Sequence, residues 1–254
     1  MCGIAGFNWN SQALVEKMLV TLRYRGPDDE GFLADSNASI GNTRLAVMDT
    51  SDRGHQPMEF ENLAIVYNGE IYGFKQLREE LEAEGYKFVS NTDTEVVLCS
   101  YHRWGPACVE RFNGMWAFCI YDKKNNTLFL SRDRFGVKPL YYYFRNGKFI
   151  FASELKAIRQ HGLNLTINVP AVNFFFYQKY IGDNLTIFDD CYKLRPSENL
   201  LFDLNRKSLT LTKYYDLERQ VVLNQDLSLA ERLDSVEGII IDAVEKRLVA
   251  DVPV

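Results

Sequence analysis

The residue best placed for chemistry is the cysteine at position 2, directly after Met1. Removal of Met1 would give Cys2 a free α-amino group beside its thiol. Their ordinary pKa values are about 8.5 for the thiol and about 7.7–8.0 for the amine, so both titrate near neutral pH. A neutral amine can accept the thiol proton, directly or through water, without a histidine. The position predicts an N-terminal nucleophile; the alternative is a buried strand cysteine without a chemical role.

The other cysteines and the histidines do not suggest a metal or disulfide site. Five cysteines are an odd number, and they lack the paired short spacings of zinc sites and disulfide frameworks. We expect four of them to be small core residues, namely Cys99, Cys108, Cys119 and Cys191. The scattered histidines, His55, His102 and His161, fit surface or packing positions. We therefore expect no metal and no cofactor in this chain.

Composition excludes several classes of protein. The chain has 254 residues, of which 46% are hydrophobic, enough for a sizeable core. A net charge of −5 does not favour a nucleic-acid partner, which would need a basic surface. The longest strongly apolar stretch, residues 115–121, is far shorter than the roughly 18 residues of a membrane span. Without a recognisable secretory signal either, we expect a cytoplasmic protein that does not contact membranes.

Apolar periodicity places Cys2 at the start of a strand in an α+β fold. We expect strands at 2–9, 31–34, 38–47 and 63–72, and helices at 12–22, from Phe74 towards Gly85, and from Thr92 or Asp93 to Gly105. Hairpins follow at 115–131, at 140–151 around Asn146-Gly147, and at about 192–215. Strands dominate while helices come in clusters, which indicates two sheet layers flanked by helices.

The sequence changes character after Tyr215. Residues 216–230 are polar and are typical of a linker. An amphipathic helix is expected next, with a stripe formed by Leu233, Val236, Ile240, Val244 and Leu248. Residues 250–254 then resemble the beginning of an apolar strand. We interpret 1–215 as one complete domain, and 216–254 as a linker with the first helix and strand of an incomplete second domain.

Seven segments carry a resemblance to a known family. The opening MCGIAGF (1–7) resembles the start of class II glutamine amidotransferases, which are N-terminal nucleophile hydrolases. Six later segments are similar to asparagine synthetases: RYRGPD (23–28), TRLAV (43–47), YNGEIY (67–72), NTDTE (91–95), SRDRFGVKPLY (131–141) and FASELK (151–156). One departure is Tyr24, where many members have histidine. The resemblance implies an αββα sandwich of two antiparallel sheets flanked by helices.

The resemblance also implies roles for five residues beside Cys2. Arg44 would bind the α-carboxylate of glutamine, and Glu70 with Asp93 its α-ammonium group. Asn68 and Gly69 would form the oxyanion hole. Competing interpretations are an ion pair of Arg44 with Glu70, a helix cap at Asp93, and a simple turn at Asn68-Gly69.

Two further segments have interpretations without a catalytic role. In residues 131–141 we expect Arg132, Asp133 and Arg134 to form an ion-pair network, in a turn shaped by Gly136 and Pro139. The aromatic run at 174–177 is interpreted as core, with a contact to another domain as the alternative.

The implied activity is hydrolysis of glutamine to glutamate and ammonia through a thioester on Cys2. Ammonia would serve an ATP- and Mg²⁺-dependent synthetase domain, in cis or in trans, whose pyrophosphate loop we expect beyond Val254. This chain alone should not make asparagine. Two alternatives stay open: an amidotransferase serving another acceptor, and a truncated non-catalytic homologue that acts as a binding module. A homodimer is compatible with each of them.

Overall fold

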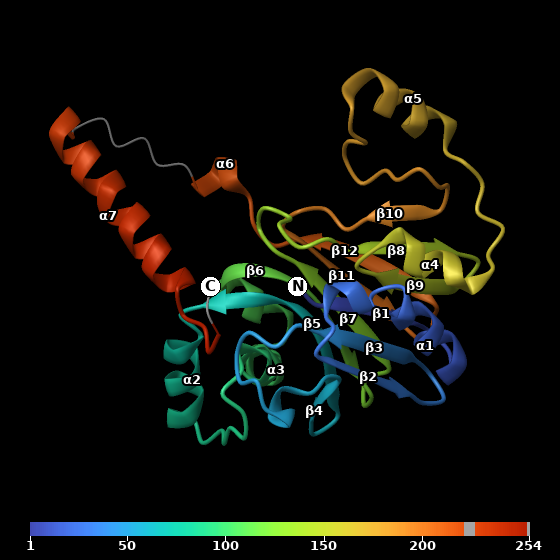
Figure 1. Cartoon of the computed structure of the whole chain (residues 1–254), viewed down its shortest axis with the longest axis horizontal. Helices are drawn as coiled ribbons and strands as arrows, with labels where there is room; N and C mark the ends of the chain where they lie inside the picture. Colours follow the sequence, from blue (N-terminus) through green and yellow to red (C-terminus); the bar gives the residue numbers. More distant parts are fainter. Residues whose placement is uncertain (221–226, 253–254) are drawn as a thin grey trace.

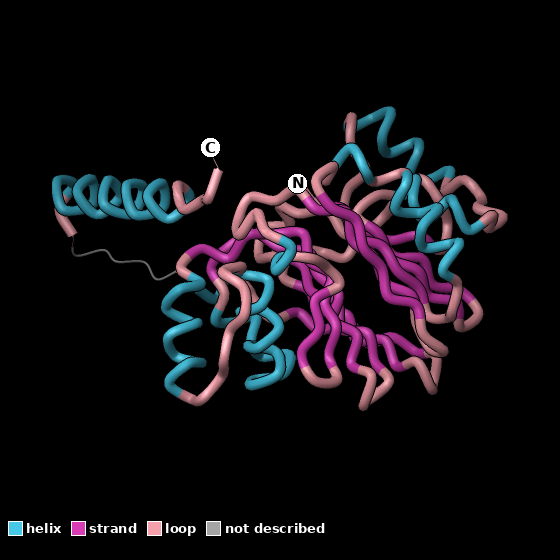
Figure 2. Tube along the Cα trace, turned by 60° about the horizontal axis from the view of Figure 1, so that its bottom comes forward, coloured by secondary structure: helices cyan, strands magenta, loops and turns pink. Residues whose placement is uncertain are grey.

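Two six-stranded antiparallel sheets pack face to face and carry helices on their outer faces (Figures 1 and 2). The computed structural model describes residues 1–220 and 227–252. The space between the sheets is filled by apolar side chains from both, among them Ile4, Val66, Phe149 and Leu200. The predicted α+β sandwich of two antiparallel sheets flanked by helices is confirmed.

The first sheet holds the N-terminal strand near its centre. Its order is β10 (Cys191–Lys193), β8 (Tyr141–Arg145), β9 (Lys148–Ala152), β1 (Gly3–Phe7), β3 (Ser39–Arg44) and β2 (Asp29–Ala34). All five residues of β1 are buried between β9 and β3. A Cβ at Gly6 would lie 2.5 Å from the Phe151 ring and 2.7 Å from the Ser39 carbonyl oxygen, so only glycine fits there. Cys2 therefore sits at the end of a firmly held strand.

The second sheet provides the long strand opposite Cys2. Its order is β12 (Ser208–Lys213), β11 (Glu198–Asp203), β7 (Thr127–Arg132), β6 (Asn113–Asp122), β5 (Leu63–Tyr72) and β4 (Met58–Phe60). The strands β5 and β6 pair over ten residues, from Leu63 opposite Asp122 to Tyr72 opposite Asn113. Because β4 covers only the first part of β5, the second part is left as a sheet edge that faces the site.

Helices cover both outer faces. Helices α1 (Gln12–Val20) and α4 (Leu155–Ile158) pack on the first sheet, and α2 (Phe74–Ala83) and α3 (Asp93–Trp104) on the second. Short 3₁₀ helices lie at Arg23–Arg25, Asp52–Gly54, Gly105–Arg111 and Arg159–His161. The four cysteines expected in the core are buried there.

Local signals in the sequence are visible in the structure. Asn146 (φ 50°) and Gly147 (φ 74°) form the left-handed turn between β8 and β9. Thr92, not Asp93, caps α3, because its side chain accepts the Glu95 N–H at 3.3 Å.

The aromatic run of α5 (Val169–Gln178) lies on the surface, so its interpretation as core is wrong. Phe176 is 70% and Tyr177 84% exposed, and Ala171 is the buried residue of this helix. Figure 1 shows α5 at the periphery, beyond the short strand β10. Spacing of apolar residues predicts a helix face, but it does not specify what the face packs against.

The predicted ion-pair network of residues 132–134 is also wrong. The buried Asp133 carboxylate accepts backbone N–H groups instead, from Phe135 at 3.1 Å, Val137 at 2.9 Å, Lys138 at 3.0 Å and Trp116 at 3.2 Å. The neighbouring arginines donate to main-chain carbonyls, Arg132 to Lys138 at 2.8 Å and Arg134 to Glu110 at 2.9 Å. The charged side chains thus satisfy backbone groups of a tight turn that lies outside the strands.

The described part of the C-terminal segment, residues 216–220 and 227–252, contains two helices. Helix α6 (Leu217–Gln220) lies in the predicted linker, part of which falls outside the described residues. Helix α7 (Leu229–Arg247) begins with a capping box of Ser228 and Glu231, and its predicted apolar stripe is exposed. Residues 250–252 are not in a strand, and Pro253 and Val254 of the strand expected at 250–254 lie outside the described residues.

We predict that Asp133→Ala lowers the free energy of unfolding by about 3–5 kcal/mol, because the substitution leaves buried amide groups without a hydrogen-bond acceptor. Denaturant unfolding of the purified protein measures this. Phe135→Ala, an exposed neighbour on the same turn, is the control and should change stability by less than about 0.5 kcal/mol. Equal effects of the two substitutions would contradict the role of Asp133.

Candidate active site

A cavity of about 230 Å³ opens between the ends of the two sheets, next to the N-terminus. All six residues singled out in the sequence line it: Cys2, Arg44, Asn68, Gly69, Glu70 and Asp93. They come from the start of β1, the end of β3, the second half of β5 and the first turn of α3. The fold therefore brings together residues that are up to 91 positions apart in the chain.

Cys2 is fixed by its backbone and its sulfur. The Leu45 N–H donates to Cys2 Sγ at 3.4 Å, and the thiol points back to the Leu45 carbonyl at 3.8 Å. Arg25 Nε donates to the Cys2 carbonyl at 3.0 Å, while Arg25 Nη1 pairs with Glu154 at 2.7 Å. Burial raises the pKa of the Cys2 thiol, so the sulfur is protonated at neutral pH and needs a base before it can attack.

Lys138 is a residue of the cavity that the sequence interpretation missed. It is buried and lines the cavity with Cys2 and Glu70. Burial lowers the pKa of its ammonium group, and the ionised forms of Cys2 and Glu70 raise this pKa. The segment 131–141 was interpreted as architectural; a lysine among the apolar residues 137–140 is the signal that could have marked this position.

The N-terminal amine, carried by Met1 in this chain, is also affected by the charges of Lys138 and Arg25. In the chain with Met1, burial lowers the pKa of the terminal amine. The negative charges of Cys2 and Asp28 raise this pKa, and the positive charges of Lys138 and Arg25 lower it. Both cations favour the neutral amine, which is the form that accepts a proton. The net effect is a lowered pKa for the amine of Met1.

Arg44 is buried, and its guanidinium group is held by main-chain carbonyls. Nη2 donates to Met48 O at 2.9 Å and Asp49 O at 2.6 Å, and Nη1 donates to Ser51 O at 3.1 Å. The competing interpretation of Arg44 as the ion-pair partner of Glu70 does not hold, because these carbonyls take up the guanidinium. Three neutral acceptors leave its positive charge uncompensated, facing the cavity.

Asn68 and Gly69 lie inside β5, opposite Ala117 and Trp116, so the interpretation as a simple turn is wrong. Both polar side-chain atoms of Asn68 are buried, and among the described residues neither has a hydrogen-bond partner. Unsatisfied buried amides are rare in native proteins and are often functional. A Cβ at Gly69 would lie 2.5 Å from the Met115 carbonyl oxygen, so this position requires glycine.

The N–H of Gly69 faces the same cavity. Alternate residues of a strand direct their N–H groups to the same side. Tyr67 N donates to Gln56 Oε1 at 2.7 Å and Ile71 N to Asp93 Oδ2 at 2.8 Å, both on the side away from β6. Gly69 lies between them, so its N–H points to the open edge of β5, where Cys2 lies. Asn68 and Gly69 thus offer two donors side by side.

Asp93 and Glu70 form the acidic side of the cavity. Asp93 is buried and accepts the Tyr67 hydroxyl at 2.7 Å as well as the Ile71 N–H. Burial raises its pKa, while these hydrogen bonds oppose the rise. Burial and the nearby Asp93 also raise the pKa of Glu70. The positive charges of Lys138 and Arg247 partly oppose this rise at Glu70. Two neighbouring carboxylates with raised pKa values would be stabilised by a ligand with a positive charge.

A family model described as "Glutamine amidotransferase domain" matches residues 1–215. The chain belongs to this family. The resemblance seen in the sequence motifs is confirmed, and so is the expectation of an enzyme of the glutamine amidotransferase type.

The relatives include asparagine synthetases and amidases. A putative asparagine synthetase [glutamine-hydrolyzing] of Methanocaldococcus jannaschii is 38% identical, over the whole of this chain and 53% of that protein. Asparagine synthetase [glutamine-hydrolyzing] 3 of Bacillus subtilis is 36% identical, over the whole chain and 42% of that protein. The amidase chry2 of Gibberella zeae is 32% identical, over 40% of that protein. The chain thus spans about half the length of these relatives.

A solved structure supports the fold. The glutamine phosphoribosylpyrophosphate amidotransferase of B. subtilis superposes with a TM-score of 0.65 at 19% identity, covering 84% of this chain and 49% of that one.

Within residues 1–220 and 227–252, no group of three or more histidine, cysteine and acidic side chains is arranged to hold a metal ion. Over the same described ranges, none of the helices has the length and apolar character needed to cross a membrane.

We predict that Lys138→Met raises the pKa of the Cys2 thiol. The thiolate raises the pKa of Lys138, and this interaction is mutual, so the ammonium group lowers the pKa of the thiol. The rate of Cys2 alkylation by iodoacetamide, followed against pH by mass spectrometry, reports that pKa. Lys138→Arg retains the charge and serves as control. Superimposable curves for all three proteins would show that Lys138 does not act on the sulfur.

Proposed function

We propose that this domain hydrolyses glutamine to glutamate and ammonia, with Cys2 as nucleophile after removal of Met1. The observation that carries the proposal is the single cavity that unites an N-terminal cysteine, two adjacent N–H donors and opposite charges at its two ends. A zwitterion with an amide tail matches this arrangement. Glutamine has both features.

Glutamine recognition follows from the charges in the cavity. Arg44 binds the α-carboxylate, since its guanidinium is oriented by carbonyls and not neutralised by an acid. Glu70 and Asp93 bind the α-ammonium group. The charged head is then fixed, and the amide tail extends towards Cys2, Asn68 and Gly69.

The reaction proceeds by acyl transfer. The α-amine of Cys2 takes the thiol proton, and the sulfur attacks the amide carbon of glutamine. Asn68 Nδ2 and Gly69 N–H stabilise the negative oxygen of the tetrahedral intermediate. When the intermediate collapses, the protonated α-amine of Cys2 gives its proton to the leaving nitrogen. Ammonia is released, and a thioester between Cys2 and the glutamyl group remains. Water then attacks the thioester, with the amine as base, and glutamate leaves as the thiol re-forms.

The ammonia would supply a synthetase domain in the same or another polypeptide. In this arrangement, residues 1–215 form the glutaminase domain, and residues 216–254 form a linker with the first elements of that second domain. The support is that the family match ends at residue 215 and that the asparagine synthetase relatives are about twice as long. ATP and Mg²⁺ belong to the synthetase half. For the chain itself, the proposed location is the cytoplasm, and a homodimer is the proposed assembly.

A second candidate is an amidotransferase of the same family with an acceptor other than aspartate. The amidase relative of G. zeae, which covers the whole chain, favours this candidate. Both candidates share the glutaminase chemistry and differ only in the acceptor domain. Reconstitution with the partner domain, ATP and aspartate separates them, because asparagine forms only under the first.

We predict that Cys2→Ala abolishes glutamate release from glutamine, with a loss of at least about 10³-fold in kcat. The protein should be Met1-free, as verified by intact mass. A chain that retains Met1 is the matched control and should be comparably inactive, because its terminal nitrogen at Cys2 is an amide. Full activity of the Met1-retaining chain would exclude the amine as base, and activity in Cys2→Ala would exclude the nucleophile.

We further predict that Asn68→Ala lowers kcat by about 10²–10³-fold with little change in KM, since its amide contacts the oxyanion rather than the substrate. The melting temperature should not fall much, because the Asn68 amide makes no hydrogen bond within the described structure. Asn62→Ala, outside the cavity and bonded to Asp122 at 2.8 Å, is the control and should leave kcat unchanged. A collapse of stability in Asn68→Ala, with kcat retained per folded molecule, would contradict the assignment.

A further inference from the structure

The segment that follows α7 returns to the wall of the glutamine cavity. Asp251 N–H donates to the Val47 carbonyl at 3.0 Å, and the Asp251 Oδ2 atom accepts the Asp49 N–H at 2.7 Å. Figure 1 shows α7 beside the sandwich, with its C-terminal end against the region between α2 and β5. Two hydrogen bonds therefore join residues that are about 200 positions apart, and both reach the same short loop, residues 45–51.

The 45–51 loop supplies contacts to both ends of the site. At its start, Leu45 hydrogen-bonds the sulfur of Cys2. At its far end, the carbonyls of Met48, Asp49 and Ser51 hold the guanidinium of Arg44. A displacement of this loop would thus move the carboxylate-binding arginine.

Asp49 is the residue where these contacts meet. It is buried and has a left-handed backbone (φ 46°), which costs free energy in a non-glycine residue. Its carboxylate accepts the Asn91 N–H at 2.8 Å and the Ser51 hydroxyl at 2.5 Å, and its carbonyl accepts from Arg44. The N–H of Asp49 is paired with Asp251, so the strained conformation is completed from the C-terminal segment.

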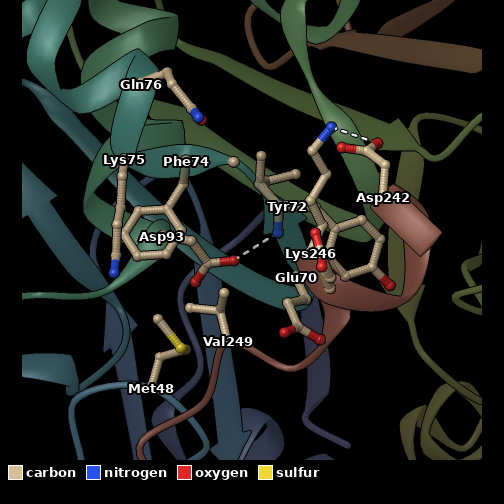
Figure 3. Close-up of a pocket in the computed structure, with 13 residues that line it drawn as sticks. Met48, Glu70, Tyr72, Phe74, Lys75, Gln76, Asp93, Asp242, Lys246 and Val249 are labelled. Atoms are coloured by element: carbon tan, nitrogen blue, oxygen red, sulfur yellow. Dashed lines mark hydrogen bonds and ion pairs between the residues drawn. The ribbon is translucent and has the colours of Figure 1, made fainter. Parts of the chain in front are cut away.

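A second cavity extends this contact. It has a volume of about 320 Å³ and lies between α7, the end of β5 and the start of α2 (Figure 3). Val249 and Met48 line it together with Glu70 and Asp93, which also line the Cys2 cavity. Arg247 lies 4.4 Å from the ring centroid of Tyr72 in the same region. The end of α7 and residues 249–251 thus cover the rear of the acidic wall.

We propose that Asp251 is a positioning residue for glutamine, coupling the end of α7 to Arg44 through the 45–51 loop. This inference rests on the proposed glutaminase function and deepens it. Asp251 does not touch substrate; it acts by holding Val47 and Asp49, and thereby the carbonyls that orient Arg44. Displacement of residues 248–252 from the loop weakens glutamine binding, and docking of the segment strengthens it.

The test is the steady-state kinetics of glutamine hydrolysis by the full chain without Met1. Asp251→Ala should raise KM by about 5- to 15-fold and change kcat by less than about twofold, because binding and not the acyl transfer is affected. Asp251→Asn keeps an oxygen that accepts the Asp49 N–H and should restore KM to within about twofold of the wild type. Asp234→Ala, which removes an exposed acid on α7, is the matched control and should behave as the wild type.

Amide hydrogen exchange of residues 47–51, without substrate, is the second measurement. Faster exchange at Asp49 in Asp251→Ala, absent in the Asp234→Ala control, is expected. An unchanged KM in Asp251→Ala overturns the proposal, as does an unchanged exchange rate. A wild-type chain without glutaminase activity overturns the proposed function instead, and the exchange data then still decide whether Asp251 holds the loop.

Discussion

The fixed position of the chain terminus is the constraint on which the site depends. Chain ends are ordinarily poorly ordered unless they are tied into a sheet. Here β1 pairs on both sides, with β3 and β9, and Arg25, itself held by Glu154, binds the Cys2 carbonyl. A terminal amine can act on its own thiol only if the residue that carries both is held in one place. The central position of β1 provides that rigidity, and the close packing at Gly6 is its structural consequence.

Several features of the site reduce the stability of the folded protein. Asn68 buries an amide without a partner, Asp93 and Glu70 lie side by side with raised pKa values, and Asp49 has a left-handed backbone. Each feature costs free energy in the empty protein, and each is suited to a zwitterionic substrate that brings the missing charges and acceptor. Backbone groups carry much of the compensation: carbonyls of the 45–51 loop orient Arg44, and amides of the 133–138 turn surround Asp133.

Beyond the sandwich, the chain presents apolar side chains to solvent on α5 and α7. The helix α7 nevertheless returns to the site at its end, where Asp251 bonds the 45–51 loop. The family match covers residues 1–215, while the relatives extend to about twice the length of this chain. The C-terminal segment is therefore both outside the family-matched domain and in contact with the wall of the candidate site.

The sequence alone determined the candidate nucleophile, most of the strands and helices, the fold class and six residues that line one cavity. Local patterns were sufficient for the strands and helices, because alternation of apolar and polar residues, helix caps and the Asn146-Gly147 turn act over a few residues. The seven motifs together were sufficient for the family and for the cavity residues. The partners of charged side chains were decided only by the tertiary structure. Asp133 binds amides rather than arginines, Lys138 faces the cavity, the α5 aromatics are exposed, and Asp251 meets Asp49. These outcomes depend on which groups from distant parts of the chain converge, and no local pattern of residues encodes that convergence.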